Sequence, residues 1–212
     1  MTHLYLIRHG RTAWNHADRL QGWADHPLDS VGRAQAAAVA AALREVPFDA
    51  LYTSPLRRAR ETADLIAEPH GLPVQPDDRL RERNVGEWVG LTLDEARARA
   101  PELFAGDWRQ AGAPGGEPQA ALAARVAAAL ADIVAAHPEG TVALVSHGGS
   151  LSAMLTHVLG IPITRTVSFS FHNTAYARLI FKPGPNGAAT VRLISLGDDR
   201  HLNGLTDEPA EL

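Results

Sequence analysis

The segment LYLIRHGRTAWN, residues 4–15, places a charged triplet directly after a short apolar run. The run at residues 3–7 predicts a β-strand, because apolar stretches of this length are typical of buried strands. The triplet Arg8-His9-Gly10 follows where that strand must end. A buried strand that ends in a basic turn with a histidine is therefore the first sign of both the fold and the function.

Two later segments repeat this arrangement. Residues 50–53 predict a second strand, which is followed by the stretch from Ser54 to Arg58. Residues 141–146, TVALVS, are apolar and partly β-branched, as is typical of a fully buried parallel strand, and the triplet His147-Gly148-Gly149 follows them. Because ligands of α/β proteins bind at the carboxyl ends of the strands, we expect these three turns to meet in one crevice.

Helices are predicted between the strands. Thr92 and Glu95 form a capping-box pattern at the start of one helix, and Ser30 is the expected cap of another. A Gly/Pro-rich stretch at residues 101–118 predicts a loop. This alternation indicates an α/β fold, a three-layer sandwich with a mostly parallel central sheet and helices on both faces. The expected helices cover residues 30–44, 56–68, 92–99, 120–136 and 151–159, and further strands are expected at residues 167–171, 175–181 and 190–196, the last two joined by a turn at residues 182–187.

The composition excludes several classes of chemistry. The chain has no cysteine, which removes disulfides, thiolate nucleophiles and cysteine-based metal sites. Lys182 is the only lysine, and no P-loop motif is present. A net charge of −4 argues against a general binder of nucleic acid or of membrane surfaces. No apolar stretch approaches the roughly 20 residues of a membrane helix. A cytoplasmic location is the default expectation for such a chain.

The histidines and arginines of the three turns suit phosphoryl transfer. Arginine binds phosphate through a planar fork of donors, and a neutral imidazole, with an unperturbed pKa of about 6.5, is a competent nucleophile. A second histidine, if protonated, adds a donor and positive charge, and with two arginines present no metal or other cofactor is then needed to neutralise the phosphate. The same residues allow a second interpretation, in which the histidines are structural, the arginines form a solvated helix face and the glycines make a tight turn. Taken alone, the pattern predicts an anion-binding crevice with histidines.

Five blocks, in order along nearly the whole chain, resemble the histidine phosphatase superfamily, also called phosphoglycerate mutase-like. The blocks are residues 4–15 (LYLIRHGRTAWN), 19–36 (RLQGWADHPLDSVGRAQA), 54–63 (SPLRRARETA), 80–92 (LRERNVGEWVGLT) and 145–149 (VSHGG). The resemblance implies the three-layer α/β fold inferred above, as one domain over residues 1–212 with a small cap or insertion around residues 86–119.

The resemblance also implies roles for individual residues. His9 is expected to be the nucleophile that becomes phosphohistidine. Glu82 is expected to protonate the leaving oxygen and then to activate water, although spacing alone does not choose between Glu82 and its neighbours Asp78 and Glu87. The expected phosphate ligands are Arg8, Arg58 and His147, the expected substrate-binding residues are Asn15, Gln21, Gly22 and Gly148, and no metal site is expected.

The favoured function is hydrolysis of a small phosphorylated metabolite, a phosphomonoester. Mutases of this family are longer and carry a Lys/Arg-rich segment after the acid, whereas residues 89–119 contain no lysine. A cofactor-dependent phosphoglycerate mutase is the alternative, and a non-catalytic member that binds a phosphorylated ligand is the second alternative.

Three further expectations concern the rest of the chain. Trp108 and Arg109 are candidates for a substrate contact, with packing of the cap as the other explanation for Trp108. His201 is expected to tie the C-terminal segment near the site. A homodimer through the C-terminal strands and the identity of the natural substrate are left open.

Overall fold

The computed structural model describes residues 1–165, 167–184 and 189–205, and its centre is a six-stranded sheet in the order β3-β2-β4-β1-β5-β6. Strands β1 to β4 are parallel to one another. At one side of the sheet, β5 runs antiparallel to β1 and β6 runs antiparallel to β5. The strands are β1 (Thr2–Arg8), β2 (Ala50–Thr53), β3 (Val74–Pro76), β4 (Thr141–Ser146), β5 (Tyr176–Pro183) and β6 (Ala189–Asp198).

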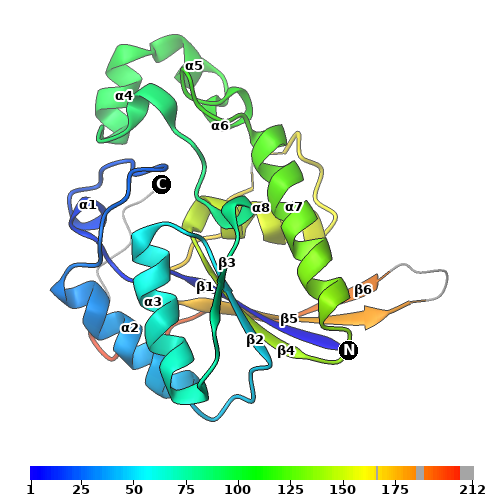
Figure 1. The fold of residues 1–212 in the computed structure, drawn as a ribbon. Coiled ribbons are helices and arrows are strands. Elements are labelled where there is room, and N and C mark those ends of the chain that lie inside the picture. The colour runs from blue at the N-terminus through cyan, green and yellow to red at the C-terminus, as the bar shows by residue number, and fades with distance from the viewer. Residues whose placement is uncertain (166, 185–188, 206–212) are drawn as a thin grey trace.

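Alternating side chains of the central strands form two separate hydrophobic cores. On β1, Leu4 and Leu6 point into one core and Tyr5 and Ile7 into the other. This is the two-residue period of a strand that is buried on both faces. Helices α2 (Ser30–Leu43) and α3 (Arg57–Ala67) cover one face of the sheet, and α7 (Gln119–Ala136) and α8 (Gly148–Val158) cover the other (Figure 1). The expected three-layer α/β fold with a mostly parallel sheet is confirmed.

Helix α2 begins one residue earlier than expected from Ser30 as its cap, because the N-cap is Asp29. Ser30 is the first helical residue, whereas Asp29 is the N-cap and its Oδ1 accepts a hydrogen bond from the Gly32 amide at 2.7 Å. An aspartate at this position also suits the positive end of the helix dipole. The turn after β1 packs tightly here, because a Cβ atom added to Gly32 would lie 1.9 Å from the Arg11 carbonyl oxygen. The capping box of Thr92 and Glu95, at the start of α4 (Leu93–Arg99), is confirmed.

Two expectations about irregular segments are wrong. The predicted loop at residues 101–118 contains two short helices, α5 (Pro101–Ala105) and α6 (Trp108–Ala111). Pro101 starts α5 because its fixed φ and missing N–H suit the first turn of a helix. The predicted strand at residues 167–171 is extended chain outside the sheet. Its alternation arises because Phe169 and Phe171 pack against the core, and no neighbouring strand pairs with it.

Several short elements gave no usable signal in the sequence. Strand β3 is only 3 residues long, and helix α1 (Ala13–His16) only 4. Three 3-10 turns were also not expected: η1 (Glu68–His70), η2 (Asp78–Leu80) and η3 (Gly86–Trp88). The predicted turn at residues 182–187 lies partly outside the described residues. β5 begins one residue later and ends two residues later than the strand predicted at residues 175–181, and β6 extends beyond the strand predicted at residues 190–196 at both ends.

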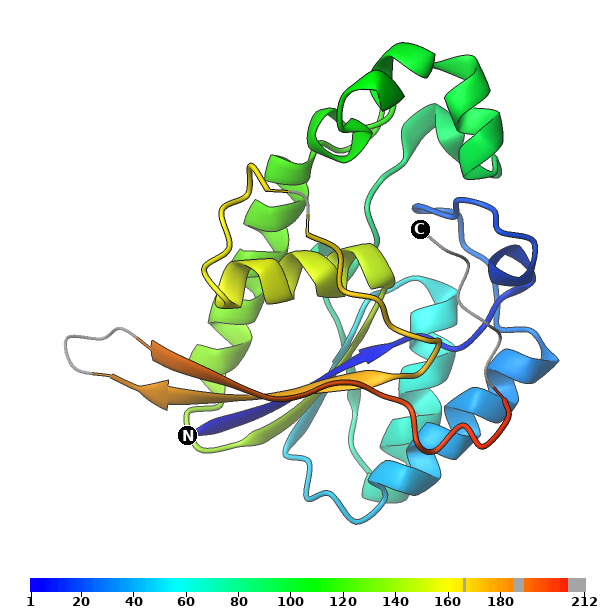
Figure 2. The ribbon, with the colours of Figure 1, turned by 180° about the vertical axis from the view of Figure 1, so that it is seen from behind.

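Helices α4, α5 and α6 form a separate small layer above the sheet (Figures 1 and 2). They pack around their own cluster, in which Trp88 and Trp108 meet at 5.3 Å and Trp88 stacks on Phe104 at 5.4 Å. Trp108 is only 8% exposed, and Arg83 and Arg109 lie over its ring at 5.9 and 4.8 Å. This burial favours the packing explanation for Trp108 over a contact with substrate.

Helix α7 is, by length and composition, apolar enough to span a membrane, contrary to the expectation that no stretch approaches that size. The reason is its high alanine content. Four of its larger apolar side chains repeat at helical spacing and are buried in the core between α7 and the sheet: Leu122, Val126, Leu130 and Ile133. That is the pattern of a core helix in a globular domain.

Candidate active site

The carboxyl ends of β1, β2 and β4 bring the three expected turns together. The register of the sheet pairs Arg8 with Ser146, so His9 and His147 are neighbours, with ring centroids 5.0 Å apart. Ser54 follows β2, and its hydroxyl lies 2.8 Å from Nε2 of His147. Arg58 reaches the same ring from α3, with Nε 3.2 Å from Nδ1 of His147. These side chains are buried, since none of the four residues is more than 3% exposed.

One nitrogen of His9 is held in a defined protonation state. Nδ1 lies 2.7 Å from the Gly10 carbonyl oxygen. Because a carbonyl only accepts hydrogen bonds, Nδ1 carries the proton and Nε2 keeps its lone pair. Burial, together with the positive charges of Arg58 and Arg8, lowers the pKa of His9 well below its usual value. The ring is therefore a neutral imidazole at neutral pH, which is the nucleophilic form.

The main chain of Arg8 and His9 is held by a segment before β5 that the sequence did not indicate. The Thr174 amide donates to the carbonyl oxygens of Arg8 and His9 at 3.1 and 3.3 Å. Asn173 adds a hydrogen bond from Nδ2 to the His9 carbonyl at 2.9 Å. Thr174 is fully buried at a φ of 64°, a conformation that costs free energy in a threonine and that this close fit stabilises. Nε2 of His201 lies 3.1 Å from the Thr174 hydroxyl, so His201 lies near the site as expected.

His147 is oriented by Arg58 on one side and by Ser54 on the other. Because the Arg58 guanidinium can only donate, Nδ1 of His147 accepts, and Nε2–H donates to Ser54. Burial, and then the charge of Arg58, lower the pKa of His147 well below its usual value. In this structure the Nε2 proton therefore points to Ser54. The expected donation to a phosphoryl oxygen requires this proton to change its partner.

Two guanidinium groups supply positive charge beside the histidines. Arg58 donates to the carbonyl oxygens of Ala24 and Gly22, both at 2.8 Å, and burial lowers its pKa to about 10, so it stays charged at neutral pH. Nη1 of Arg8 donates to the Phe171 carbonyl at 2.5 Å. Nε of Arg8 is buried with no hydrogen-bond partner among the described residues. A buried donor of this kind costs free energy unless a ligand pairs with it, and an anion would do so.

The carboxylate of Glu82 lies at the start of α8. Its Oε2 accepts from the Gly149 amide at 3.1 Å, and its Oε1 accepts from the Arg83 amide at 2.7 Å. Gly149 permits this approach, because a Cβ atom there would lie 2.5 Å from Oε1 of Glu82. Asp78, by contrast, pairs with Arg81 at the surface with 73% of its side chain exposed. This geometry favours Glu82 over Asp78 as the acid of the site.

Two of the expected substrate-binding residues, Asn15 and Gln21, contact Thr12. The Thr12 hydroxyl lies 3.0 Å from Oδ1 of Asn15 and 3.0 Å from Oε1 of Gln21. Gly22 follows Gln21 at a φ of 49°, and its carbonyl oxygen is one of the two that accept hydrogen bonds from Arg58. Gly148 approaches Arg8, since a Cβ atom there would lie 3.9 Å from Nε of Arg8. The described residues contain no group of three or more His, Asp or Glu side chains placed to hold a metal ion.

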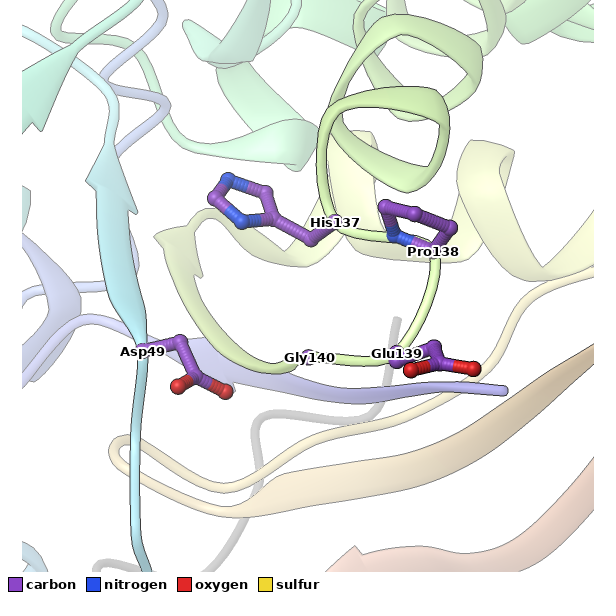
Figure 3. A pocket seen from close by; sticks show the side chains of 5 residues that line it. All are labelled: Asp49, His137, Pro138, Glu139 and Gly140. Carbon is purple, nitrogen blue, oxygen red and sulfur yellow. The ribbon is translucent and has the colours of Figure 1, made fainter.

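A second hollow lies at the opposite end of the sheet. It has a volume of about 480 Å³ and is lined by Asp49, His137, Pro138, Glu139 and Gly140 (Figure 3). Two of its side chains are already engaged, since Asp49 accepts from the Thr141 amide at 2.7 Å and His137 meets the Tyr52 hydroxyl at 3.0 Å. The hollow lies at the amino ends of β2 and β4, far from the end at which α/β proteins bind their ligands.

Folding stability is expected to fall as the pH drops below about 6.5. His9 and His147 stay neutral in the folded protein because their pKa values are lowered, whereas unfolded histidines bind protons near pH 6.5. The unfolded state then binds more protons, so the free energy of unfolding decreases by about 1.4 kcal/mol per pH unit for each histidine. Urea unfolding between pH 7.5 and 5.5 measures this slope. His147→Gln should reduce the slope by about one histidine's share, and the exposed control His157→Gln should not. Equal slopes for His147→Gln and the wild type would contradict a neutral buried His147.

A buried nucleophilic imidazole, two guanidinium groups and a carboxylate at the ends of parallel strands define a class of phosphoryl-transfer protein. The sequence matches the family described as the histidine phosphatase superfamily (branch 1) over residues 4–193, and the chain belongs to this family.

Relatives of two kinds are similar to the chain. A protein of Yersinia pestis named probable phosphoglycerate mutase GpmB is 33% identical over 211 residues, which cover 96% of each chain. The structure of the mycobacterial glucosyl-3-phosphoglycerate phosphatase Rv2419c has a TM-score of 0.82 at 32% identity, covering 92% of this chain and 98% of that one. A mutant phosphoserine phosphatase of Entamoeba histolytica, solved with phosphoserine, has a TM-score of 0.83 at 30% identity, covering 95% and 100%.

Proposed function

We propose that the chain is a metal-independent phosphatase that hydrolyses small phosphomonoesters through a phosphohistidine on His9. The observation that carries this proposal is the buried His9 ring, whose Nδ1 is bonded to the Gly10 carbonyl, whose Nε2 keeps its lone pair, and whose pKa is lowered by burial and by the charges of Arg58 and Arg8. The arrangement matches the needs of phosphoryl transfer, in which positive charge around the equatorial oxygens and an aligned nucleophile do most of the work.

The reaction proceeds in two balanced steps. In the first, Nε2 of His9 attacks phosphorus, the bond to the ester oxygen breaks, and the Glu82 carboxyl group gives its proton to that oxygen. Arg8 and Arg58 neutralise the charge on the phosphoryl oxygens. In the second step the Glu82 carboxylate takes a proton from water, the resulting hydroxyl bonds to phosphorus, and the N–P bond breaks. Free phosphate leaves, and neutral His9 and protonated Glu82 are regenerated.

The mutase is the second candidate function, because the similar Yersinia proteins carry that name and have nearly the same length as this chain. Length therefore does not separate the two activities here. Hydrolysis is favoured by the similar structures that are named phosphatases, and by the lack of lysine between residues 89 and 119. The substrates for which those proteins are named suggest that the alcohol part is a small, hydrophilic metabolite, and we propose that the reaction takes place in the cytoplasm.

Phosphate release from a panel of phosphomonoesters, measured in excess EDTA, tests the proposal. The panel includes 3-phosphoglycerate, glucosyl-3-phosphoglycerate and phosphoserine. We expect release from at least one ester at a rate that EDTA does not reduce. Movement of phosphate between positions of phosphoglycerate with little free phosphate would instead establish the mutase. Binding of esters without release or transfer would establish a non-catalytic member.

A further inference from the structure

The carbonyl groups of the segment that carries Glu82, residues 79–82, are held by side chains. Residues 79 and 80 end the 3-10 turn η2, and residues 81 and 82 follow it outside any strand; each of these four carbonyl oxygens accepts a hydrogen bond from a side chain. Ser146 donates to the carbonyl of residue 80 at 2.7 Å, Ser150 to that of residue 81 at 2.6 Å, and Trp23 to that of residue 82 at 2.7 Å. The remaining hydrogen bonds to these carbonyl oxygens come from one residue of α7.

That residue is Arg125, which binds three of the four carbonyl groups. Its Nη1 donates to the carbonyl oxygens of Arg79 and Arg81 at 2.8 and 2.7 Å, and its Nη2 donates to that of Glu82 at 2.9 Å. The other side of the guanidinium forms a two-point ion pair with Glu117, with both distances 2.7 Å. The planar fork of arginine, and no other side chain, can satisfy this set of acceptors at once.

The position of Arg125 is itself rigid. Only 17% of its side chain and 12% of that of Glu117 are exposed, and its helix packs into the core through Leu122 and Val126. The Glu82 carbonyl oxygen is therefore held by both Arg125 and Trp23, while the Glu82 carboxylate meets the start of α8. A reacting group that is held by rigid partners keeps its geometry within the few tenths of an ångström that proton transfer requires.

We propose that Arg125 is the positioning residue of the general acid, and that it acts on catalysis only through the placement of Glu82. This inference rests on the proposed role of Glu82. It predicts a particular kinetic signature for Arg125, because an acid matters most when the leaving oxygen is strongly basic. Loss of Arg125 should therefore slow the hydrolysis of alkyl phosphates much more than the hydrolysis of aryl phosphates, although Arg125 itself is not expected to contact either substrate.

The test compares kcat/KM for an alkyl phosphate and for p-nitrophenyl phosphate, because kcat/KM reports the step in which the leaving group departs. Arg125→Lys keeps the charge beside Glu117 but loses the fork. We expect this variant to lower kcat/KM by about 10- to 100-fold for the alkyl ester and by less than about 3-fold for the aryl ester. Arg200→Lys is the matched control, since Arg200 forms an exposed ion pair with Asp198 at 2.6 Å and 86% of its side chain is exposed. It should change neither value.

Two further variants make the result decisive. Glu117→Gln weakens the ion pair of Arg125 without removing Arg125, and it should lower kcat/KM for the alkyl ester selectively, but less than Arg125→Lys does. This variant tests the proposal even where Arg125→Lys does not fold. In a Glu82→Gln background, Arg125→Lys should add no further selective loss, because the group that it positions is gone. If Arg125→Lys and Glu117→Gln lower kcat/KM equally for both esters while Glu82→Gln lowers it selectively for the alkyl ester, the role of Arg125 is wrong and the role of Glu82 stands. Equal losses for Glu82→Gln itself would overturn the acid and the positioning role together.

Discussion

Replacement of His9 by alanine is expected to lower kcat by about 10⁴- to 10⁶-fold for every phosphomonoester, which is the usual cost of removing a covalent nucleophile. No other group in the site can take over. The chain has no cysteine, and both ring nitrogens of His147 are already engaged, one by Arg58 and one by Ser54. The wild type, mixed briefly with a ³²P-labelled ester and quenched in base, should carry label on protein, whereas His9→Ala should carry none.

The matched control for this prediction is His157→Ala. His157 is an exposed histidine on α8, the helix that begins in the site, and it has no contact with His9. It should keep the wild-type rate and the label. Label on His9→Ala protein at a wild-type level would show that another residue is the nucleophile, and unlabelled wild type that still releases phosphate would favour direct attack by water.

The sequence was most informative where burial alone determines structure. Residues 4–7 and 142–145 are buried on both faces of the sheet, so their side chains must all be apolar, and this leaves a continuous apolar run that is easy to recognise. The turns after such strands must converge, because parallel strands end at the same edge. Hence the sequence alone predicts that His9, Arg58 and His147 lie near one another.

Other features depend on contacts between segments that are distant in the chain. Arg125 lies in an alanine-rich helix, and nothing near it in sequence indicates that it binds the carbonyl groups of residues 79–82. Thr174 and Asn173 likewise carry no local signal of their contact with His9. The wrong strand at residues 167–171 has the same origin, since alternating apolar residues also occur in an extended segment that packs on a core without pairing. Periodicity reports burial, and it does not report hydrogen-bond partners.

Replacement of Glu82 by glutamine is expected to be the second most damaging change. Glutamine keeps an oxygen that can accept from the Gly149 amide, but it has no proton to give to the leaving oxygen. We expect kcat/KM to fall by about 10²- to 10³-fold for an alkyl phosphate and by less than about 10-fold for p-nitrophenyl phosphate, whose leaving group needs little protonation. With the aryl ester, phosphoenzyme should accumulate, because Glu82 also activates water in the second step. A rapid-mixing burst of p-nitrophenol measures this. Equal losses on both esters, with no burst, would remove Glu82 from the acid role.

Gly149→Ala tests the same carboxylate without removing it. The added Cβ atom would lie 2.5 Å from Oε1 of Glu82, so the carboxylate must move, whereas the nucleophile and the arginines keep their contacts. Since a displacement of about 1 Å can cost up to about 100-fold, we expect a loss of about 10-fold or more that is again selective for the alkyl ester. Gly106→Ala is the control, because the nearest atom to its added Cβ would be the Leu103 carbonyl oxygen at 3.9 Å, an ordinary contact. If Gly149→Ala folds with the wild-type melting temperature and treats both esters as the wild type does, the carboxylate beside α8 is not the proton donor, and the first step must obtain its proton from elsewhere.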